Sequence, residues 1–241
     1  MAGKLIMQNQ GQKFSGAREV TTNQNGVFEH LEALVLRYVH TEFRRPFAEH
    51  TVAAFAEADA FVRAAGRPVV LDSGCGTGRS SFALAARFPD AVVVAVDKSQ
   101  VRLTKAALQN SETSKLAERI LFVRAELLDF WRLALEAGWN IQHHAVFYPN
   151  PWPKASEATR RFHLSPVFPA LLKLAPSMEL RTNWKIYAEE FAMAAQIACC
   201  ELQMKCDVRL NEFVPEVPET AFEEKYADAG QKLWKVVYAK I

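Results

Sequence analysis

Residues 72–78 read Asp72-Ser73-Gly74-Cys75-Gly76-Thr77-Gly78 and join a short apolar run, Pro68-Val69-Val70-Leu71, to a helical pattern from Ser80 to Phe88. A short apolar run that ends in a glycine-rich turn is typical of a buried strand. Glycine lets the backbone turn tightly and lets a ligand approach the amides at the start of the next helix. A second apolar run, 91–96, ends at Asp97. This stretch therefore predicts a right-handed βαβ unit with a ligand at the turn.

The alternation of strand and helix patterns continues along the chain. We expect strands at 120–123, 144–148 and 178–181, helices at 99–110, 160–175 and 184–198, and strand-like runs at about 204–213 and 233–239. Since no long helical pattern separates the last two runs, they predict an antiparallel hairpin. The expected fold class is α/β: a Rossmann-like, doubly wound, mostly parallel sheet of about seven strands with a C-terminal antiparallel hairpin and an N-terminal helical extension.

The sequence predicts one domain preceded by a flexible arm. Residues 1–26 are rich in Gln, Asn and Gly, a composition typical of flexible segments. From Val27 to Ala65 apolar residues recur at helical spacing, with a break near Arg44-Arg45-Pro46, so two helices are expected there. We therefore expect an arm over 1–26 and a single domain over 27–241, which is long enough to bury one substantial core.

Composition narrows the class of protein. With 29 Lys and Arg against 27 Asp and Glu the net charge is +2, so any basic surface must be local. No apolar stretch reaches the roughly 18 to 20 residues of a bilayer span, and no apolar leader follows the first residues, so we expect a cytoplasmic protein. The histidines and the four cysteines lack ligand spacing, which favours reduced structural thiols and no metal.

Carboxylates follow three successive expected strands. The turn reads G-x-G-x-G after an acid, unlike the G-x-G-x-x-G that holds a pyrophosphate, so it favours a ligand without one. S-adenosylmethionine fits: Asp72 can hold the ammonium of its aminoacyl end, directly or through water, Asp97 can accept both ribose hydroxyls, and Glu126 can accept from the adenine amino group. The cofactor-binding residues expected are Asp72, Gly74, Gly76, Gly78, Asp97, Glu126 and Leu127. A nicotinamide or flavin site and a ligand-free turn remain alternatives.

Three further segments carry a family resemblance. They are Phe147-Tyr148-Pro149-Asn150-Pro151-Trp152-Pro153-Lys154 followed by Arg160-Arg161-Phe162, then Thr182-Asn183-Trp184-Lys185-Ile186-Tyr187-Ala188, and then Pro218-Glu219-Thr220-Ala221-Phe222-Glu223-Glu224-Lys225. In this order, after the glycine turn, they resemble the signature of the tRNA (guanine-N7)-methyltransferases. The resemblance runs from about 68 to 238, and Arg18 and Gln24 in the arm match it faintly.

The resemblance implies an S-adenosylmethionine-dependent enzyme that acts on tRNA. It implies that the target guanine lies between the Pro-Trp loop and the C-terminal motif, with Asn150 and Glu223 as catalytic residues. It further implies a substrate-binding set in which basic side chains approach tRNA phosphates, comprising Asn150, Trp152, Lys154, Arg160, Arg161, Asn183, Thr220 and Glu223. It leaves the oligomeric state, monomer or homodimer, open.

The chain departs from its family at two positions. The family has aspartate where this chain has Asn150 and again where it has Asn183. Guanine N7 carries an in-plane lone pair and no proton, so its methylation needs alignment rather than a general base. A nearby carboxylate would still stabilise the positive charge that develops on the purine. Two other functions therefore stay open: methyl transfer to a different base or a small molecule, and a non-catalytic RNA-binding role.

Overall fold

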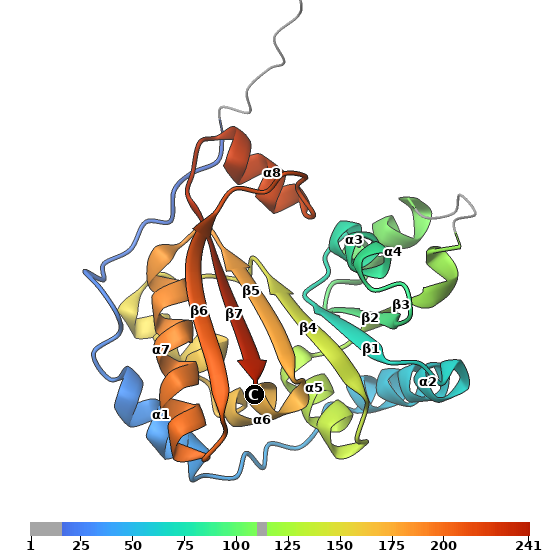
Figure 1. Cartoon of the computed structure of the whole chain (residues 1–241), viewed down its shortest axis with the longest axis horizontal. Helices are drawn as coiled ribbons and strands as arrows, with labels where there is room; N and C mark the ends of the chain where they lie inside the picture. The colour runs from blue at the N-terminus through green and yellow to red at the C-terminus, as the bar shows by residue number, and fades with distance from the viewer. Residues whose placement is uncertain (1–15, 110–114) are drawn as a thin grey trace, which may run out of the picture.

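The computed structural model describes residues 16–109 and 115–241, which build a seven-stranded sheet in the order β3-β2-β1-β4-β5-β7-β6 (Figure 1). The strands are β1 (Val69–Ser73), β2 (Val92–Asp97), β3 (Ile120–Arg124), β4 (Ile141–Phe147), β5 (Ser177–Thr182), β6 (Cys206–Phe213) and β7 (Leu233–Lys240). The first five pair in parallel, and β7 runs antiparallel to both β5 and β6. The expected α/β fold with a mostly parallel sheet is confirmed.

The direction in which strands are added reverses between β1 and β4. From β1 the chain moves outward through β2 to β3, and it then returns to the other side of β1 to form β4 and β5. In open α/β sheets ligands bind at the carboxyl ends of the strands at such a switch point. The glycine turn of 74–78 leaves β1 at this place.

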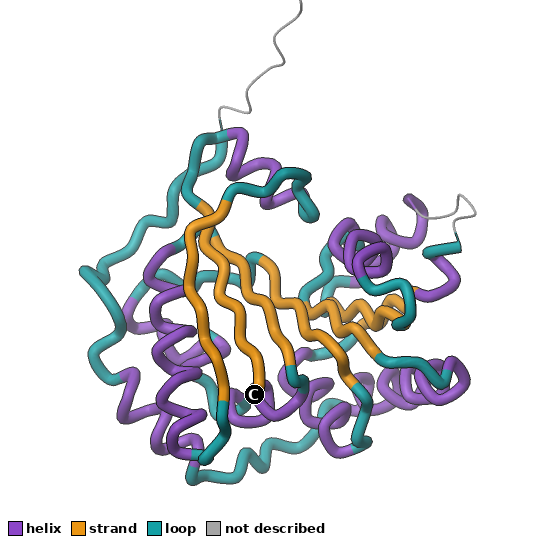
Figure 2. Tube along the Cα trace, in the orientation of Figure 1, coloured by secondary structure: helices purple, strands orange, loops and turns teal. Residues whose placement is uncertain are grey.

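Helices cover both faces of the sheet, but unequally. They are α1 (Leu31–Val39), α2 (Glu49–Ala65), α3 (Arg79–Arg87), α4 (Gln100–Gln109), α5 (Leu127–Glu136), α6 (Phe168–Leu174), α7 (Lys185–Glu201) and α8 (Ala221–Asp228). Apolar residues of α1, α2, α5, α6 and α7 share one core with one face, and those of α3 and α4 share a second core with the other. Among the described residues, no helix runs along β5, β7 and β6 on that second face (Figure 2).

The position of each strand in the sheet explains how deeply its residues are buried. Every residue of β1 and β2 is buried, although their sequences, VVLDS and VVVAVD, carry an acid each. Nearly continuous apolar runs are typical of parallel strands covered on both faces. In β6, at the edge of the sheet, no residue is fully buried.

Two expectations about helices need correction. The expected helix over 160–175 is wrong in its first half, because α6 begins only at Phe168 and is preceded by 3₁₀ turns at Ala155–Arg160 and Phe162–Leu164. Ser165, with ψ 148°, is extended because it precedes Pro166, whose ring disfavours a helical conformation in the residue before it. The last two strands do pair antiparallel, but they are joined through α8 rather than by a tight turn.

The N-terminal region contains the expected pair of helices, α1 and α2, separated by a segment that includes Pro46. Residues 1–15 of the expected arm lie outside the described residues. Further along the arm, the Thr22 hydroxyl donates to the carbonyl of Pro153 at 2.6 Å, and the amide of Gln24 donates to Glu190 at 3.2 Å. This part of the arm is therefore anchored to the domain.

Candidate functional site

The glycine turn lies at the carboxyl end of β1 and leaves open space next to its backbone. Gly74, Gly76 and Gly78 have φ angles of 81°, 57° and 82°, which other residues rarely adopt. The amides of Gly74 and Cys75 donate to the carbonyl of Val96 at 2.8 and 3.1 Å, which fixes the turn against β2. A Cβ atom at Gly74 would have no neighbour within 4 Å, so a ligand has room to approach the backbone there.

Gly78 has a different role in the same turn. A Cβ atom at this position would lie 2.8 Å from the ring of Phe122, which is too close for real atoms. Its φ angle of 82° also places it as the left-handed residue before α3. Gly78 therefore allows α3 to pack closely on β3, and its expected contact with the cofactor remains a prediction.

Asp97 sits at the end of β2 beside the turn. Its Oδ2 accepts from the amide of Gly76 at 3.0 Å and its Oδ1 from the amide of Ser99 at 2.8 Å. A carboxylate offers about four acceptor positions, so each oxygen keeps one for a ligand hydroxyl. The guanidinium of Arg102 lies 3.7 Å from Oδ2. This geometry fits the expected role of Asp97 at a ribose.

Asp72 lies beneath the turn rather than on its surface. It is 1% exposed, and its Oδ2 accepts from the hydroxyls of Ser80 and Ser81, each at 2.7 Å. A ligand ammonium can therefore be met only by Oδ1 or through water. Burial raises the pKa of Asp72 to about 6, and the negative charges of Asp97 and Glu219 add to the effect. The protein thus holds an acid here whose ionisation a bound cation would favour.

The third expected acid is supported by the N-terminal helices. Glu126 directly precedes α5, and its backbone amide donates to the hydroxyl of Thr51 in α2 at 3.1 Å. Glu126 and Leu127 are both half-buried at the carboxyl end of β3. Both residues thus follow β3 at the same edge of the sheet as the glycine turn and Asp97.

The loop after β4 has an unusual backbone. Tyr148 and Trp152 have φ angles of 51° and 44°, a left-handed conformation that costs about 1 to 3 kcal/mol in residues other than glycine. Asn150 is exposed, and its Oδ1 accepts from the amide of Trp152 at 3.3 Å. This bond uses the side-chain oxygen of Asn150 within the loop.

The expected base-contacting roles of Glu223 and Thr220 are not supported. Glu223 is fully buried and accepts from the Tyr148 hydroxyl at 3.0 Å, from Arg181 at 3.0 Å and from the amide of Glu219 at 2.7 Å. The Thr220 hydroxyl accepts from the amide of Glu223 at 2.9 Å and caps α8. Because these acceptors are engaged within the protein, the motif holds α8 against β5 and the loop after β4.

Asn183 also makes a contact within the protein. Its amide donates to Gln231 at 2.9 Å, and Gln231 donates to the carbonyl of Ala17 at 2.9 Å. Asn183 thereby links β5 to the segment before β7 and to the N-terminal segment. A contact between Asn183 and the substrate base remains a prediction.

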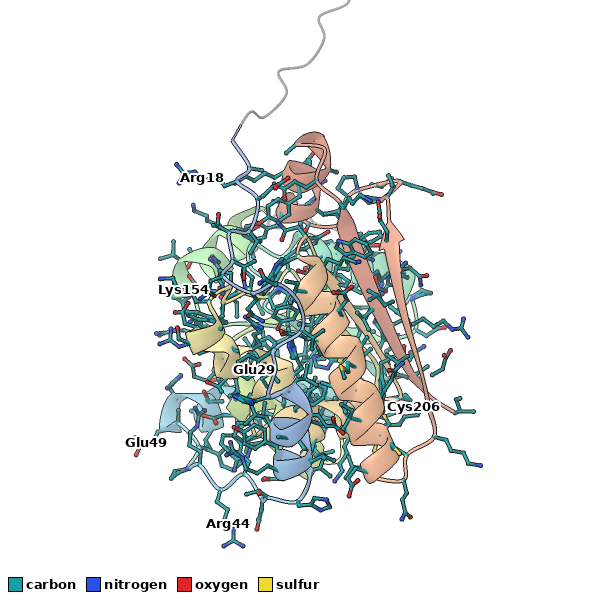
Figure 3. All side chains as sticks on the ribbon, turned by 90° about the vertical axis from the view of Figure 1, so that its left-hand side faces the viewer. Arg18, Glu29, Arg44, Glu49, Lys154 and Cys206 are labelled. Carbon is teal, nitrogen blue, oxygen red and sulfur yellow. The ribbon has the colours of Figure 1, made fainter. Side chains whose placement is uncertain are left out.

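The basic residues of the second motif separate into two kinds. Lys154 and Arg160 are exposed, and the guanidinium of Arg160 lies 4.6 Å from the centre of the Trp152 ring. Figure 3 shows Lys154 and Arg18 projecting from the same side of the molecule. Arg161 is 0% exposed, so the prediction that it contacts tRNA phosphate is wrong. Its guanidinium is instead bonded to Glu190 and to the loop.

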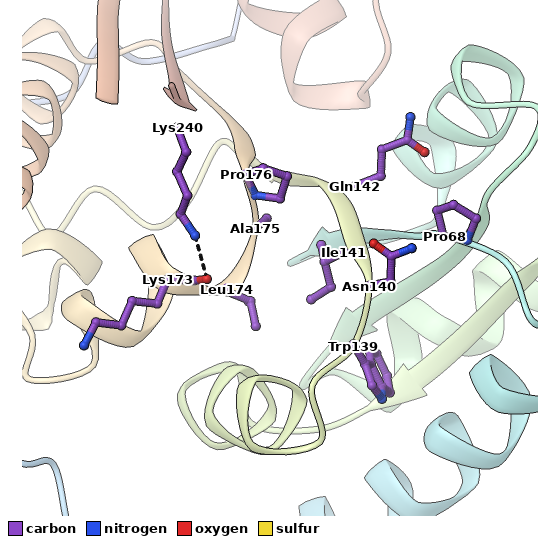
Figure 4. Close-up of a pocket in the computed structure, with 10 residues that line it drawn as sticks. All are labelled: Pro68, Trp139, Asn140, Ile141, Gln142, Lys173, Leu174, Ala175, Pro176 and Lys240. Atoms are coloured by element: carbon purple, nitrogen blue, oxygen red, sulfur yellow. Dashed lines mark hydrogen bonds between the residues drawn. The ribbon is translucent and has the colours of Figure 1, made fainter. Parts of the chain in front are cut away.

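A cavity of about 370 Å³ lies at the opposite edge of the sheet (Figure 4). Its lining includes Pro68, which precedes β1, and Ile141, which begins β4. Lys240, at the end of β7, also lines it and donates to the carbonyl of Lys173 at 2.8 Å. These are the amino ends of the parallel strands. Ligands of open α/β sheets bind at the carboxyl ends, so this cavity is separate from the candidate site.

Several supporting residues escaped the sequence reasoning. Ser80 and Ser81 hold Asp72, Thr51 holds the backbone of Glu126, and Arg181 holds Glu223. The two serines directly after the turn gave a local signal, because hydroxyls at a helix start commonly bond nearby acids and amides. Thr51 and Arg181 act across long sequence distances, so no local pattern indicates them.

Comparison with protein families places this geometry among methyltransferases. A family described as putative methyltransferase matches residues 66–236. A tRNA (guanine-N(7)-)-methyltransferase of Nocardia farcinica is 30% identical over 186 residues, covering 72% of this chain and 68% of the relative. Proteins of that name from Mycobacterium avium and Mycobacterium tuberculosis are 31% and 30% identical, covering 72% and 70% of this chain. The match covers 66% of each of these two relatives, slightly under two thirds of their length.

Solved structures share the fold at low identity. A 16S rRNA (adenine(1408)-N(1))-methyltransferase from Catenulisporales acidiphilia aligns with a TM-score of 0.55 at 15% identity, covering 76% of this chain and 90% of that one. The 16S rRNA methyltransferase KamB aligns with a TM-score of 0.53 at 17% identity, covering 82% and 95%. At these identities the alignments support the architecture alone.

We expect Asp72→Asn to stabilise the fold while weakening binding of the expected cofactor. The pKa difference between about 3.8 unfolded and about 6 folded corresponds to roughly 3 kcal/mol. This penalty is absent below pH 3.8, where the carboxyl is protonated in both states, and it is complete above about pH 6. The gain in unfolding free energy should therefore be largest near pH 7 to 8 and vanish toward about pH 4.

Urea unfolding of both proteins across this pH range measures the effect, and the exposed Asp90 provides the matched control Asp90→Asn, which should change stability little. A loss of stability in Asp72→Asn at pH 7 would contradict the conclusion that burial makes the ionised Asp72 carboxylate destabilise the fold.

Proposed function

The chain belongs to the tRNA (guanine-N7)-methyltransferase family, and on that premise we propose that it transfers a methyl group from S-adenosylmethionine to N7 of a guanine in tRNA. The observation that carries the proposal is the meeting of the glycine turn, Asp97 and Glu126 at one edge of the sheet, with the Asn150 loop following β4 at the same edge. Together these elements offer places for a cofactor and an acceptor side by side.

The cofactor supplies an activated methyl group on a positively charged sulfur when it is bound. The residues present fit it: Gly74 leaves open space over the backbone, Asp97 retains acceptor capacity for two hydroxyls, and Asp72 offers a negative charge beneath the aminoacyl end. Glu126 would accept from the adenine amino group. In this arrangement the protein binds and orients, which is what a methyl transfer by direct displacement requires.

The acceptor side is suited to a nucleophile that carries no proton. Asn150 carries an amide, which is not basic, and the carboxylate of Glu223 is engaged by Arg181, so neither acts as a general base. Guanine N7 needs no proton removed before it attacks, so alignment by the loop suffices. A site in which neither residue acts as a base favours N7 over an exocyclic amine, which loses a proton during methylation.

We propose that tRNA approaches from the side that carries Lys154, Arg160 and Arg18, where exposed cations can meet phosphates.

No helix among residues 16–109 and 115–241 is long and apolar enough to cross a membrane. A tRNA substrate is consistent with a cytoplasmic location, which we include in the proposal.

A direct assay tests the proposal. The purified chain is incubated with S-adenosylmethionine carrying a labelled methyl group and with unmodified tRNA transcripts, and the RNA is then digested to nucleosides. We expect label in 7-methylguanosine, and its loss in Asp97→Asn. Label in another nucleoside, or in a small molecule only, would support the alternative methyltransferase functions. Binding of tRNA without binding of the cofactor would support the non-catalytic role.

Asn150→Asp should raise the turnover number on tRNA by at least about tenfold, equivalent to roughly 1.4 kcal/mol in the barrier. The substitution keeps the oxygen that accepts from Trp152 and replaces the NH₂ group with a charged oxygen. That charge would lie near the purine as it becomes positive. The cofactor dissociation constant should stay within about twofold, because Asn150 is not in the expected cofactor set. Steady-state kinetics and calorimetry measure the two quantities, and a fall in turnover would indicate a different acceptor.

Neutralising Lys154 and Arg160 together should reduce the slope of log affinity for tRNA against log salt by up to about two. Both side chains are exposed, so their replacement by glutamine should leave the fold intact. The same substitutions at Arg44 and Lys205, also exposed, provide the matched control. Binding titrations at a series of salt concentrations measure the slope. Equal slopes in the two double variants would contradict the proposed approach of tRNA.

A further inference from the structure

A fully buried ion pair outside the expected cofactor site joins Arg161 to Glu190. Both side chains are 0% exposed, and the guanidinium donates to the two carboxylate oxygens at 2.7 and 2.6 Å. His163 contacts the same carboxylate at 2.9 Å. Burial opposes the ionisation of Glu190, but the hydrogen bonds from His163 and Arg161 and the charge of Arg161 outweigh it and hold the pKa of Glu190 below its ordinary range. Burial also lowers the pKa of His163. A buried ion pair is stable only when its remaining donors and acceptors are also satisfied.

The N-terminal segment supplies those remaining partners. The side-chain amide of Gln24 donates to Glu190 at 3.2 Å, and its oxygen accepts from Arg161. The backbone amide of Phe28 donates to Glu190 at 2.9 Å. The cluster therefore depends on residues more than a hundred positions away in the sequence. It is complete only when the segment from Thr22 to Phe28 is in place.

The same cluster bonds the loop that carries Asn150. Arg161 donates to the carbonyl of Trp152 at 2.8 Å and to that of Pro151 at 3.3 Å. These contacts occur where Trp152 has its left-handed φ angle of 44°. A conformation of this kind persists only when the surrounding structure holds it.

The N-terminal segment also bonds the loop directly. The Thr22 hydroxyl donates to the carbonyl of Pro153 at 2.6 Å, and the side-chain oxygen of Asn23 accepts from the amide of Ala155 at 3.0 Å. Together with the bonds from Arg161, the backbone from Pro151 to Ala155 is held from two directions. Asn150 lies at the start of this braced stretch, and its own side-chain bond ends on Trp152.

We propose that Thr22 and Gln24 are positioning residues for methyl transfer: they hold the loop of 150–155, through Pro153 directly and through the Arg161–Glu190 pair, in the conformation that presents Asn150 to the acceptor. The inference rests on the proposed function, and it assigns a catalytic consequence to a segment that the sequence pattern marked as flexible. The hydrogen bonds of the two side chains go to Pro153, to the Arg161–Glu190 pair and within the N-terminal segment, and none of these partners belongs to the expected cofactor set. Their effect falls on the turnover number and leaves cofactor affinity unchanged.

A matched pair of substitutions at Thr22 tests the proposal. Thr22→Val keeps the shape and removes the hydroxyl that donates to Pro153, whereas Thr22→Ser retains a hydroxyl. We expect Thr22→Val and Gln24→Ala each to lower the turnover number on tRNA by about tenfold or more, with the cofactor dissociation constant within about twofold of the parent. Thr22→Ser and the control Asn25→Ala, at an exposed position of the same segment, should stay close to the parent.

A second readout follows the loop without requiring activity. The chain has five tryptophans, so fluorotryptophan labelling gives few fluorine resonances, and Trp152→Phe assigns the one from the loop. We expect this resonance to shift or broaden in Thr22→Val and Gln24→Ala and to be unchanged in Thr22→Ser. If the parent chain fails to methylate tRNA while the resonance responds in this way, the proposed function is wrong and the bracing of the loop stands. An unchanged resonance with an unchanged turnover number, or an equal loss of cofactor affinity, would overturn the proposal.

Discussion

The parallel pairing of β1 with β2 on one side and β4 on the other is the constraint on which the site depends. This pairing places the ends of three strands at one edge, so that the glycine turn, Asp97 and the Asn150 loop come together, although Asp97 lies 23 residues and Asn150 76 residues after Gly74. The carbonyl of Val96 and the carboxylate of Asp97 then fix the turn by accepting from its amides. A slip of β1 by one residue would move Asp72 to the other face and remove its bonds to Ser80 and Ser81.

Charged residues in the motifs act in two physically distinct ways. Arg161 and Glu223 are fully buried, and each is bonded to several partners that fix a loop or a helix. Lys154 and Arg160 are exposed, Arg160 in a surface pair with Glu157 at 3.3 Å, and a polyanion could reach both cations. A buried charge is costly unless every bonding position is used, so residues of the first kind specify a conformation rather than meet a substrate. Charged residues that look alike in the motifs therefore differ in role: some hold the fold, and others are free to take the proposed part in binding tRNA.

The loop that follows β4 depends both on the strand ends and on buried charged residues. Its backbone adopts left-handed conformations at Tyr148 and Trp152, and bonds from Arg161, Thr22 and Asn23 maintain them. Asn150, where the family resemblance implies aspartate, keeps the bond to the amide of Trp152 that either residue can make. The loop geometry is thus compatible with the family, and the difference lies in the charge that the loop would present to the proposed purine acceptor. Chemistry at an unprotonated nitrogen tolerates that difference because alignment supplies much of the rate.

The sequence by itself determined the order of the strands along the chain, most of the helices, the glycine turn, the acids at the ends of β1, β2 and β3, and the family, because these depend on local periodicity and on motifs that are contiguous in the chain. The helices α5 and α8 were not predicted. Only the tertiary structure decided that Arg161 is buried, that Glu223 is bonded to Arg181 and that residues 22–28 are anchored. It also placed Asp72 beneath the turn, with a pKa raised to about 6 by burial. The physical reason is that the burial and the bonding partners of a residue are set by contacts across long sequence distances. The identity of a charged residue in the sequence does not show whether its side chain is exposed to water or paired with another buried charge.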